Sequence, residues 1–307
     1  MGGDSHIHTQ ITHTIPEFDD YVGFAPASIL CGRVGRKAHV VGDRQGGGER
    51  RPRRASGGQG QRRQSAPRSS GPNRARGAQP RTDDQRGSDV PLLGADIEAK
   101  QLAPEVRREL ITLDKATADY VARHLVAAGN LIDEDPDAAL AHARAARNRA
   151  GRIAAVREAV GIAAYHAGDW AQALAELRAA RRMGSKSALL PMIADCERGV
   201  GRPERAIELA RSDEAAALTG DDADELRIVV AGARSDLGQF EQALAILSTP
   251  QLDPAQTGQT AARLFYVYAD TLLALKRSDE ALQWFINAAA ADVDGVTDAE
   301  DRVTELA

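Results

Sequence analysis

The chain has 307 residues, a formal net charge of −5, two cysteines and an aromatic content of 4 %. So few aromatic residues disfavour a β-sandwich or a barrel. The cysteines, Cys31 and Cys196, lie in regions of different composition, which argues against a structural disulfide and fits a reducing compartment. No apolar run approaches the about 18–20 residues that span a bilayer, and no secretion signal is apparent, so we expect a cytoplasmic protein.

Residues 1–41 match neither of the two regions that follow. Four histidines fall here: His6, His8, His13 and His39. A His-x-His pair can ligate a metal, but no Cys or acidic framework stands at ligand spacing, so we predict no metal site. We expect this segment to be a translated upstream region, with the native start near Val40 or Val41.

Residues 42–89 are rich in Arg, Gly, Gln, Ser and Pro. Residues 42–87 contain twelve Arg and four acids, a net charge of +8, with no aromatic and no aliphatic larger than Ala. Nothing there offsets the entropy of ordering the backbone, so we predict a disordered tail. Clustered guanidinium groups favour salt-sensitive contact with RNA or the ribosome. The arginines expected to make it are Arg50, Arg51, Arg53, Arg54, Arg62 and Arg63.

Two other uses of this basic tail stay open. It could serve only as a solubilising spacer. It could also regulate the protein by occupying the rest of the chain, because the sequence from Ser88 onward carries a net charge of −12. The absence of Phe and Tyr between the arginines removes base stacking and weakens the nucleic-acid interpretation.

Residues 90–307 show the spacing of paired amphipathic helices. Two helices within 157–183 are separated by Gly168-Asp169, and residues 213–222 are expected to be a polar connection. Other helices are predicted at 105–110, 115–132, 136–149, 190–200, 204–212, 224–237, 240–247, 260–275, 278–291 and 298–306, the last as a terminal cap. We expect Cys196 to be a small buried side chain.

A glycine followed five residues later by alanine recurs along this region. The landmarks are Gly168/Ala173, Gly201/Ala206 and Gly238/Ala243, with weaker copies at Lys276/Ala281 and Glu134/Ala139. The alanines of successive copies are 34, 33, 37 and 38 residues apart. A period of about 34 residues built from helix pairs is typical of a helical solenoid.

The segments GDWAQALAELRAA, GRPERAIELA, GQFEQALAIL and KRSDEALQWFINAA resemble the turn and second helix of tetratricopeptide repeats. The resemblance covers roughly residues 104–290 and extends to actinobacterial proteins of this family with an Arg/Gly-rich N-terminal tail. The chain lacks the first-helix Trp and the Pro between repeats. The resemblance implies an all-α solenoid of about five helix pairs acting as a non-enzymatic protein-interaction scaffold.

In this family the first helices line a concave groove that binds ligands. The positions that the resemblance carries over are His124, Glu158, Ile162, Tyr165, Asp195, Arg198, Glu225, Ile228, Arg263, Tyr266 and Asp270. The Lys/Asn set with which some relatives hold a C-terminal carboxylate is absent from these positions. The acids outnumber the arginines, so we expect a partner protein or peptide with a neutral-to-basic, partly apolar segment.

No catalytic motif is found. The run 183–187 fails as a phosphate-binding loop because it lacks the upstream Gly and the preceding strand. His124, His142 and His166 stand alone on predicted helices. We therefore expect no enzyme activity, cofactor or metal, and a scaffold is the favoured function. The alternative is an RNA- or ribosome-associated factor that uses the Arg-rich tail.

Overall fold

Helices form the regular structure of residues 90–185 and 188–307 in the computed structural model, and only these residues are described here. No strand occurs within those ranges. The predictions for residues 1–41 and 42–89, including the six arginines of the tail, fall outside the described residues.

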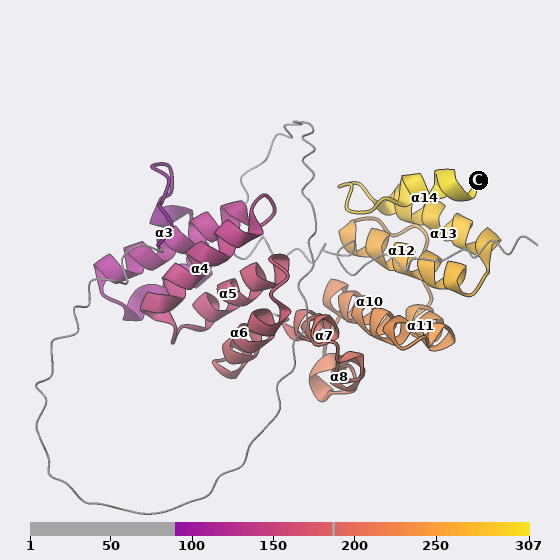
Figure 1. Cartoon of the computed structure of the whole chain (residues 1–307), viewed down its shortest axis with the longest axis horizontal. Helices are drawn as coiled ribbons and strands as arrows, with labels where there is room; N and C mark the ends of the chain where they lie inside the picture. The colour runs from indigo at the N-terminus through magenta and orange to yellow at the C-terminus, as the bar shows by residue number, and fades with distance from the viewer. Residues whose placement is uncertain (1–89, 186–187) are drawn as a thin grey trace, which may run out of the picture. The chain divides into compact units, whose positions relative to one another are not determined.

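Short helices open the described region, and longer ones follow in pairs (Figure 1). The 3₁₀ helices are η2 (Ala99–Gln101) and η3 (Leu110–Thr112). The α-helices are α2 (Pro104–Glu109), α3 (Lys115–Leu131), α4 (Pro136–Ala150), α5 (Ala154–His166), α6 (Trp170–Arg182), α7 (Leu190–Gly199), α8 (Pro203–Leu209), α9 (Asp213–Ala216), α10 (Asp221–Asp236), α11 (Phe240–Leu247), α12 (Gln259–Ala274), α13 (Ser278–Ala291) and α14 (Ala299–Leu306).

Capping residues set the helix starts in the first pair. Asp114 accepts a hydrogen bond from the backbone N–H of Thr117 at 3.0 Å, and Asp135 accepts one from Ala138 at 3.0 Å. Each bond satisfies an N–H that the helix itself leaves without a partner. Pro136 follows Asp135 at the first helical position, where its missing N–H costs nothing.

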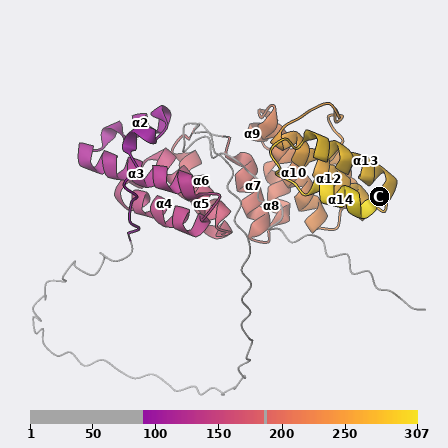
Figure 2. The same ribbon diagram turned by 90° about the horizontal axis from the view of Figure 1, so that it is seen from above.

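Helices adjacent in sequence pack into five pairs, which confirms the predicted all-α solenoid. The pairs are α3/α4, α5/α6, α7/α8, α10/α11 and α12/α13. Neighbouring pairs are joined by contacts of α4 with α5, α6 with α7, α7 with α10, and α10 with α12. Helix α14 packs on α13 and closes the series, as Figure 2 shows. Each pair therefore buries its apolar surface against its neighbours in sequence.

Four of the five intra-pair turns share one backbone geometry. Gly168, Gly201 and Gly238 have φ values of 71°, 76° and 69°, and Lys276 has 61°. In each turn the next residue donates its N–H to the carbonyl five positions back, as in the bond from Asp169 to Ala164 at 2.8 Å. This is a Schellman cap, in which the left-handed residue lets the chain leave the helix and enter its partner. The weaker copy at Lys276 is thus a true structural repeat.

The first turn differs from the other four. Glu134 does not have a positive φ, and the N–H of Asp135 bonds instead to the carbonyl of Leu131, four positions back, at 2.8 Å. The copy therefore shares the helix pairing of the repeat but not its turn.

The five alanines of the repeat are fully buried within their helix pairs. Their side chains are 0 % exposed in every copy: Ala139, Ala173, Ala206, Ala243 and Ala281. Gly161 has the same role on the first helix of the second pair, because an added Cβ would lie 2.6 Å from the Leu177 side chain. Small residues at these positions let paired helices approach closely. Cys196 is also fully buried, as predicted.

One predicted connection is wrong. Residues 213–222 contain α9 and the first two residues of α10 in place of the expected polar connection. Ser212 caps α9 by accepting a hydrogen bond from Ala215 at 3.2 Å, and two acids in its first turn suit the positive end of a helix. Ala215 and Leu218 pack on the apolar cluster between α7, α8 and α10. Tertiary burial thus orders a segment whose composition indicates a loop.

Candidate interaction surface

Polar side chains of the first helices join one repeat to the next. The hydroxyl of Tyr165 on α5 donates a 2.6 Å hydrogen bond to Asp195 on α7. The other carboxylate oxygen of Asp195 accepts from Arg198 at 2.9 Å, and Arg198 reaches Asp236 on α10 at 2.8 and 3.1 Å. Three successive first helices are therefore connected by one continuous set of hydrogen bonds.

Glycine on α10 makes room for the central arginine. A Cβ added to Gly232 would lie 2.5 Å from the guanidinium carbon of Arg198, so the arginine rests directly on the helix backbone. Burial alone would lower the pKa of Arg198, but its contacts with Asp236 and Asp195 raise it. Burial together with Asp195 raises the pKa of Tyr165 well above its usual value, so the hydroxyl remains a donor.

A second set of contacts continues the connection toward the C-terminus. Arg263 on α12 forms an ion pair with Glu225 on α10. Arg302 on α14 lies 3.3 Å from Asp270 and 3.3 Å from the hydroxyl of Tyr266, both on α12. Burial and the nearby Asp270 raise the pKa of Tyr266. We name all these side chains together the first-helix ladder: Tyr165, Asp195, Arg198, Asp236, Glu225, Arg263, Tyr266, Asp270 and Arg302.

The remaining predicted groove positions lie on the same series of helices. Glu158 is buried on α5 and accepts a 2.6 Å hydrogen bond from Ser185. Ile162 belongs to the apolar core, whereas Ile228 on α10 is half-buried. His124 on α3 is buried against α4.

The eleven predicted groove positions are less exposed than the open groove that the resemblance implies. Seven of the eleven predicted positions are buried and four are half-buried, so none is fully exposed. Most of their polar atoms are engaged by neighbouring repeats. The structure thus brings seven of the eleven predicted positions into the ladder and leaves His124, Glu158, Ile162 and Ile228 outside it.

His124 has a polar partner of its own. Its Nδ1 lies 2.9 Å from Nδ1 of His142 on α4, and both side chains are buried. One Nδ1 must carry a proton and donate the hydrogen bond, and the other must be unprotonated to accept it. This contact therefore requires at least one neutral ring. Burial, followed by the charge of His142, lowers the pKa of His124 to about 4, and burial lowers that of His142.

Two further buried carboxylates, one on α6 and one on α7, each contact two arginines. Glu176 on α6 pairs with Arg147 from α4 and with Arg157 from α5, the latter at 2.8 Å. Glu197 on α7 pairs with Arg178 from α6 and with Nε of Arg202 at 3.1 Å. Shared between two guanidinium groups, each carboxylate joins three consecutive segments of the chain.

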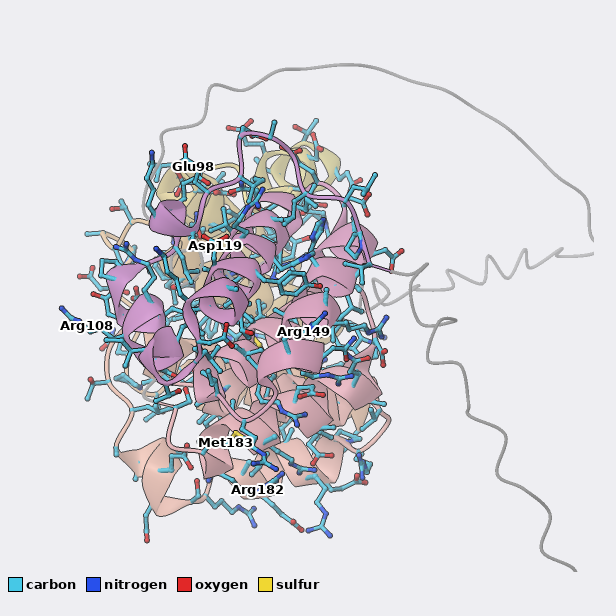
Figure 3. All side chains as sticks on the ribbon, turned by 90° about the vertical axis from the view of Figure 1, so that its left-hand side faces the viewer. Glu98, Arg108, Asp119, Arg149, Arg182 and Met183 are labelled. Atoms are coloured by element: carbon cyan, nitrogen blue, oxygen red, sulfur yellow. The ribbon has the colours of Figure 1, made fainter. Side chains whose placement is uncertain are left out.

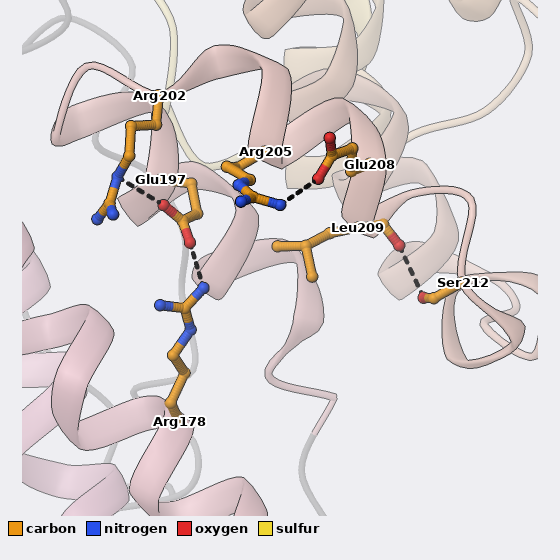
Figure 4. A pocket seen from close by; sticks show the side chains of 7 residues that line it. All are labelled: Arg178, Glu197, Arg202, Arg205, Glu208, Leu209 and Ser212. Carbon is orange, nitrogen blue, oxygen red and sulfur yellow. Dashed lines mark hydrogen bonds and ion pairs between the residues drawn. The ribbon is translucent and has the colours of Figure 1, made fainter.

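The arginine pair at Glu197 borders a cavity of about 340 Å³. Its lining, drawn in Figure 4, comes from α6, α7, the turn after α7, α8 and the turn between α8 and α9. The lining residues are Arg178, Glu197, Arg202, Arg205, Glu208, Leu209 and Ser212. This group of residues was not identified from the sequence. The sequence feature that could have indicated it is the recurrence of Arg in GRPERAIELA, close to the buried Glu197.

Two searches of the described residues found nothing. In residues 90–185 and 188–307, no group of three or more His, Cys, Asp and Glu side chains is placed to hold a metal ion. No helix in the same ranges combines the length and apolar character needed to cross a membrane.

Comparison with known proteins supports the repeat assignment. Residues 192–297 match the family model described as Tetratrico peptide repeat. The match runs from α7 to the residues after α13, which are the third, fourth and fifth helix pairs. No curated protein matches the chain. Members of this repeat family are typically non-catalytic and bind other proteins, so the match supports a protein-interaction scaffold.

Proposed function

We propose that this chain is a protein-interaction scaffold whose first helices hold a neutral-to-basic, partly apolar segment of a partner protein. The observation that carries the proposal is the first-helix ladder, which connects side chains of α5, α7, α10, α12 and α14 through hydrogen bonds and ion pairs. A surface ordered before binding loses little conformational entropy when a partner arrives.

The negative charge of the C-terminal part of the array, residues 213–307, favours a partner segment that is neutral to basic. Residues 213–307 carry six basic and eighteen acidic residues, a net charge of −12. Asp236 is the most exposed carboxylate of the ladder, with 37 % of its side chain accessible. A basic segment would therefore be attracted to this end, and the half-buried Ile228 offers it an apolar contact.

The test uses the full chain as bait in an affinity purification, followed by titration of each recovered partner in purified form. Asp236→Asn removes a charge but retains a hydrogen-bond acceptor for Arg198. We expect it to weaken a basic partner about three- to tenfold. Asp253→Asn removes the same charge from the exposed link between α11 and α12 and should have no such effect. Equal affinities for both variants would contradict the proposal.

The second candidate is an RNA- or ribosome-associated factor, supported by the net charge of +8 in residues 42–87. In that case the full chain should bind RNA with an affinity that falls steeply with salt, and deletion of residues 42–87 should abolish binding. Negligible RNA binding by both proteins would remove this candidate. The same deletion at low salt tests autoregulation, which predicts tighter binding of partners once the basic segment is gone.

A further inference from the structure

We propose that the cavity bordered by α6, α7 and α8 is a second interaction site, which binds the carboxylate side chains of an acidic peptide segment. This site is separate from the first-helix ladder and takes a ligand of opposite charge. It therefore does not depend on the function proposed above.

Two arginines at the cavity are oriented by a buried acid. The Glu197 side chain is 2 % exposed, and its two oxygens contact Arg178 and Arg202. Arg202 uses Nε for that contact, and its two terminal nitrogens lie beside the Glu197 carboxylate in Figure 4. The side chains of Arg178 and Arg202 are 41 % and 53 % exposed. Both groups are thus fixed in position while part of each remains open to a ligand.

The third arginine already binds a carboxylate within the cavity. Arg205 donates a 2.6 Å hydrogen bond to Glu208 one turn later on α8, and the two side chains are 66 % and 58 % exposed. An exposed pair of this kind contributes little to stability, because solvent screens it and two flexible side chains must be held in place. A carboxylate from a partner can therefore take the place of Glu208 on Arg205 at small cost.

The charge around the cavity favours an acidic ligand. Residues 138–212 contain thirteen basic and seven acidic residues, a net charge of +6, between flanks of −6 in 88–137 and −12 in 213–307. Arg149 and Arg182, at the ends of α4 and α6, are exposed (Figure 3). An acidic segment would be attracted to this region and repelled by both flanks, which favours one location over others.

The lining favours a peptide over a nucleic acid. None of its seven side chains is aromatic, so the cavity has no aromatic ring on which a base could stack. Leu209 supplies an apolar surface for the methylene groups of a Glu side chain, and the volume is suited to one or two side chains.

The experiment measures fluorescence anisotropy of a labelled hexaglutamate peptide with the full chain at low ionic strength. Arg205→Gln should weaken binding about fivefold or more, because one of three guanidinium groups is lost. Glu208→Gln should strengthen it about two- to fivefold, because it removes the competing carboxylate. Residues 42–87 are identical in all variants, so differences between variants report on the described region.

Arg152→Gln is the matched control, because Arg152 is exposed, belongs to the same basic region and lies outside the cavity. It should change the affinity less than twofold. Equal losses in Arg152→Gln and Arg205→Gln would overturn the proposal, since only net charge would then matter. An oligouridine that responds to the two cavity variants as strongly as hexaglutamate would also overturn it, in favour of a nucleic-acid site. Circular dichroism of each variant verifies the fold.

Discussion

At the scale of single residues, the turn of each repeat requires one residue with a left-handed backbone. Glycine adopts this conformation freely, whereas any residue with a Cβ is strained there by about 1–2 kcal/mol. Three turns use Gly, but the fifth places Lys276 at a φ of 61°. The last helix pair therefore contains a local strain that the three central pairs avoid.

Lys276→Gly should stabilise the protein. The substitution relieves strain but adds freedom to the unfolded chain, so we expect a net gain of about 0.5–1 kcal/mol. The converse change, Gly238→Ala, should lower stability by about 1 kcal/mol. Its added Cβ would meet no atom within 4 Å, so only backbone strain acts. Chemical denaturation measures both, and a loss of stability in Lys276→Gly would contradict the assignment of the turn.

The histidine pair gives stability a defined pH dependence. An unfolded histidine titrates near pH 6.5, whereas His124 in the folded state has a pKa of about 4. Between these two pH values the unfolded chain therefore binds more protons than the folded chain. The contribution of His124 to the free energy of unfolding is fully present above about pH 6.5 and is lost as the pH falls toward 4. At pH 5 the loss from His124 should be about 1–2 kcal/mol.

Urea denaturation at pH 7.5 and pH 5 checks this dependence. The double substitution of His124 and His142 by Leu removes both titrating groups. The decrease in the free energy of unfolding between pH 7.5 and pH 5 should then be smaller by about 1–2 kcal/mol. An unchanged decrease in the double variant would assign the pH dependence to other groups.

At the scale of elements, hydrogen bonds between first helices should hold neighbouring repeats in place. Tyr165→Phe removes the donor to the buried Asp195 and leaves a carboxylate oxygen with one contact fewer. The expected cost is about 1–3 kcal/mol in the free energy of unfolding. Tyr268→Phe is a suitable comparison, because this half-buried ring packs on Trp284 and should cost less than about 0.5 kcal/mol. Equal effects would mean that the ladder contributes nothing to coupling between repeats.

The helix pairs could be predicted from the sequence because each is specified by nearby residues. A Gly turn, a small residue five positions later and an apolar stripe lie within about 34 residues, and the predicted α11 and α13 match the structure residue for residue. Helix α9 was missed because its order depends on packing against α8 and α10, which the local composition does not show.

The depth of the first-helix side chains could not be predicted in the same way. Whether Asp195 and Arg198 are exposed depends on α5 and α10, because Tyr165 contacts Asp195 from 30 positions away and Asp236 contacts Arg198 from 38 positions away. The arginine cavity has the same origin, because its lining combines residues from three helices and two turns. Repeat spacing predicts which helix carries a residue, and inter-repeat packing decides what that residue contacts.

At the scale of the whole molecule, a linear series of pairs predicts that damage at one end stays local. Helix α14 covers the last pair: Arg302 lies 4.9 Å above the Phe285 ring, and Val303 and Leu306 pack on the C-terminal apolar cluster. Within the described residues it packs mainly on α13, and its Arg302 also contacts α12. Stability in such an array is approximately a sum of repeat terms and nearest-neighbour terms.

Truncation after Thr297 removes α14 and should therefore expose the outer surface of the last pair. We expect amide hydrogen exchange in α12 and α13 to accelerate about tenfold or more, while protection in α3–α6 remains within about twofold of the full chain. Substituting Arg302 by Leu, which keeps an apolar contact with Phe285 but loses the ion pair with Asp270, should give a smaller acceleration confined to the same helices. Equal loss of protection across α3–α6 would show that the pairs unfold as one cooperative unit, and the nearest-neighbour account of this chain would then be wrong.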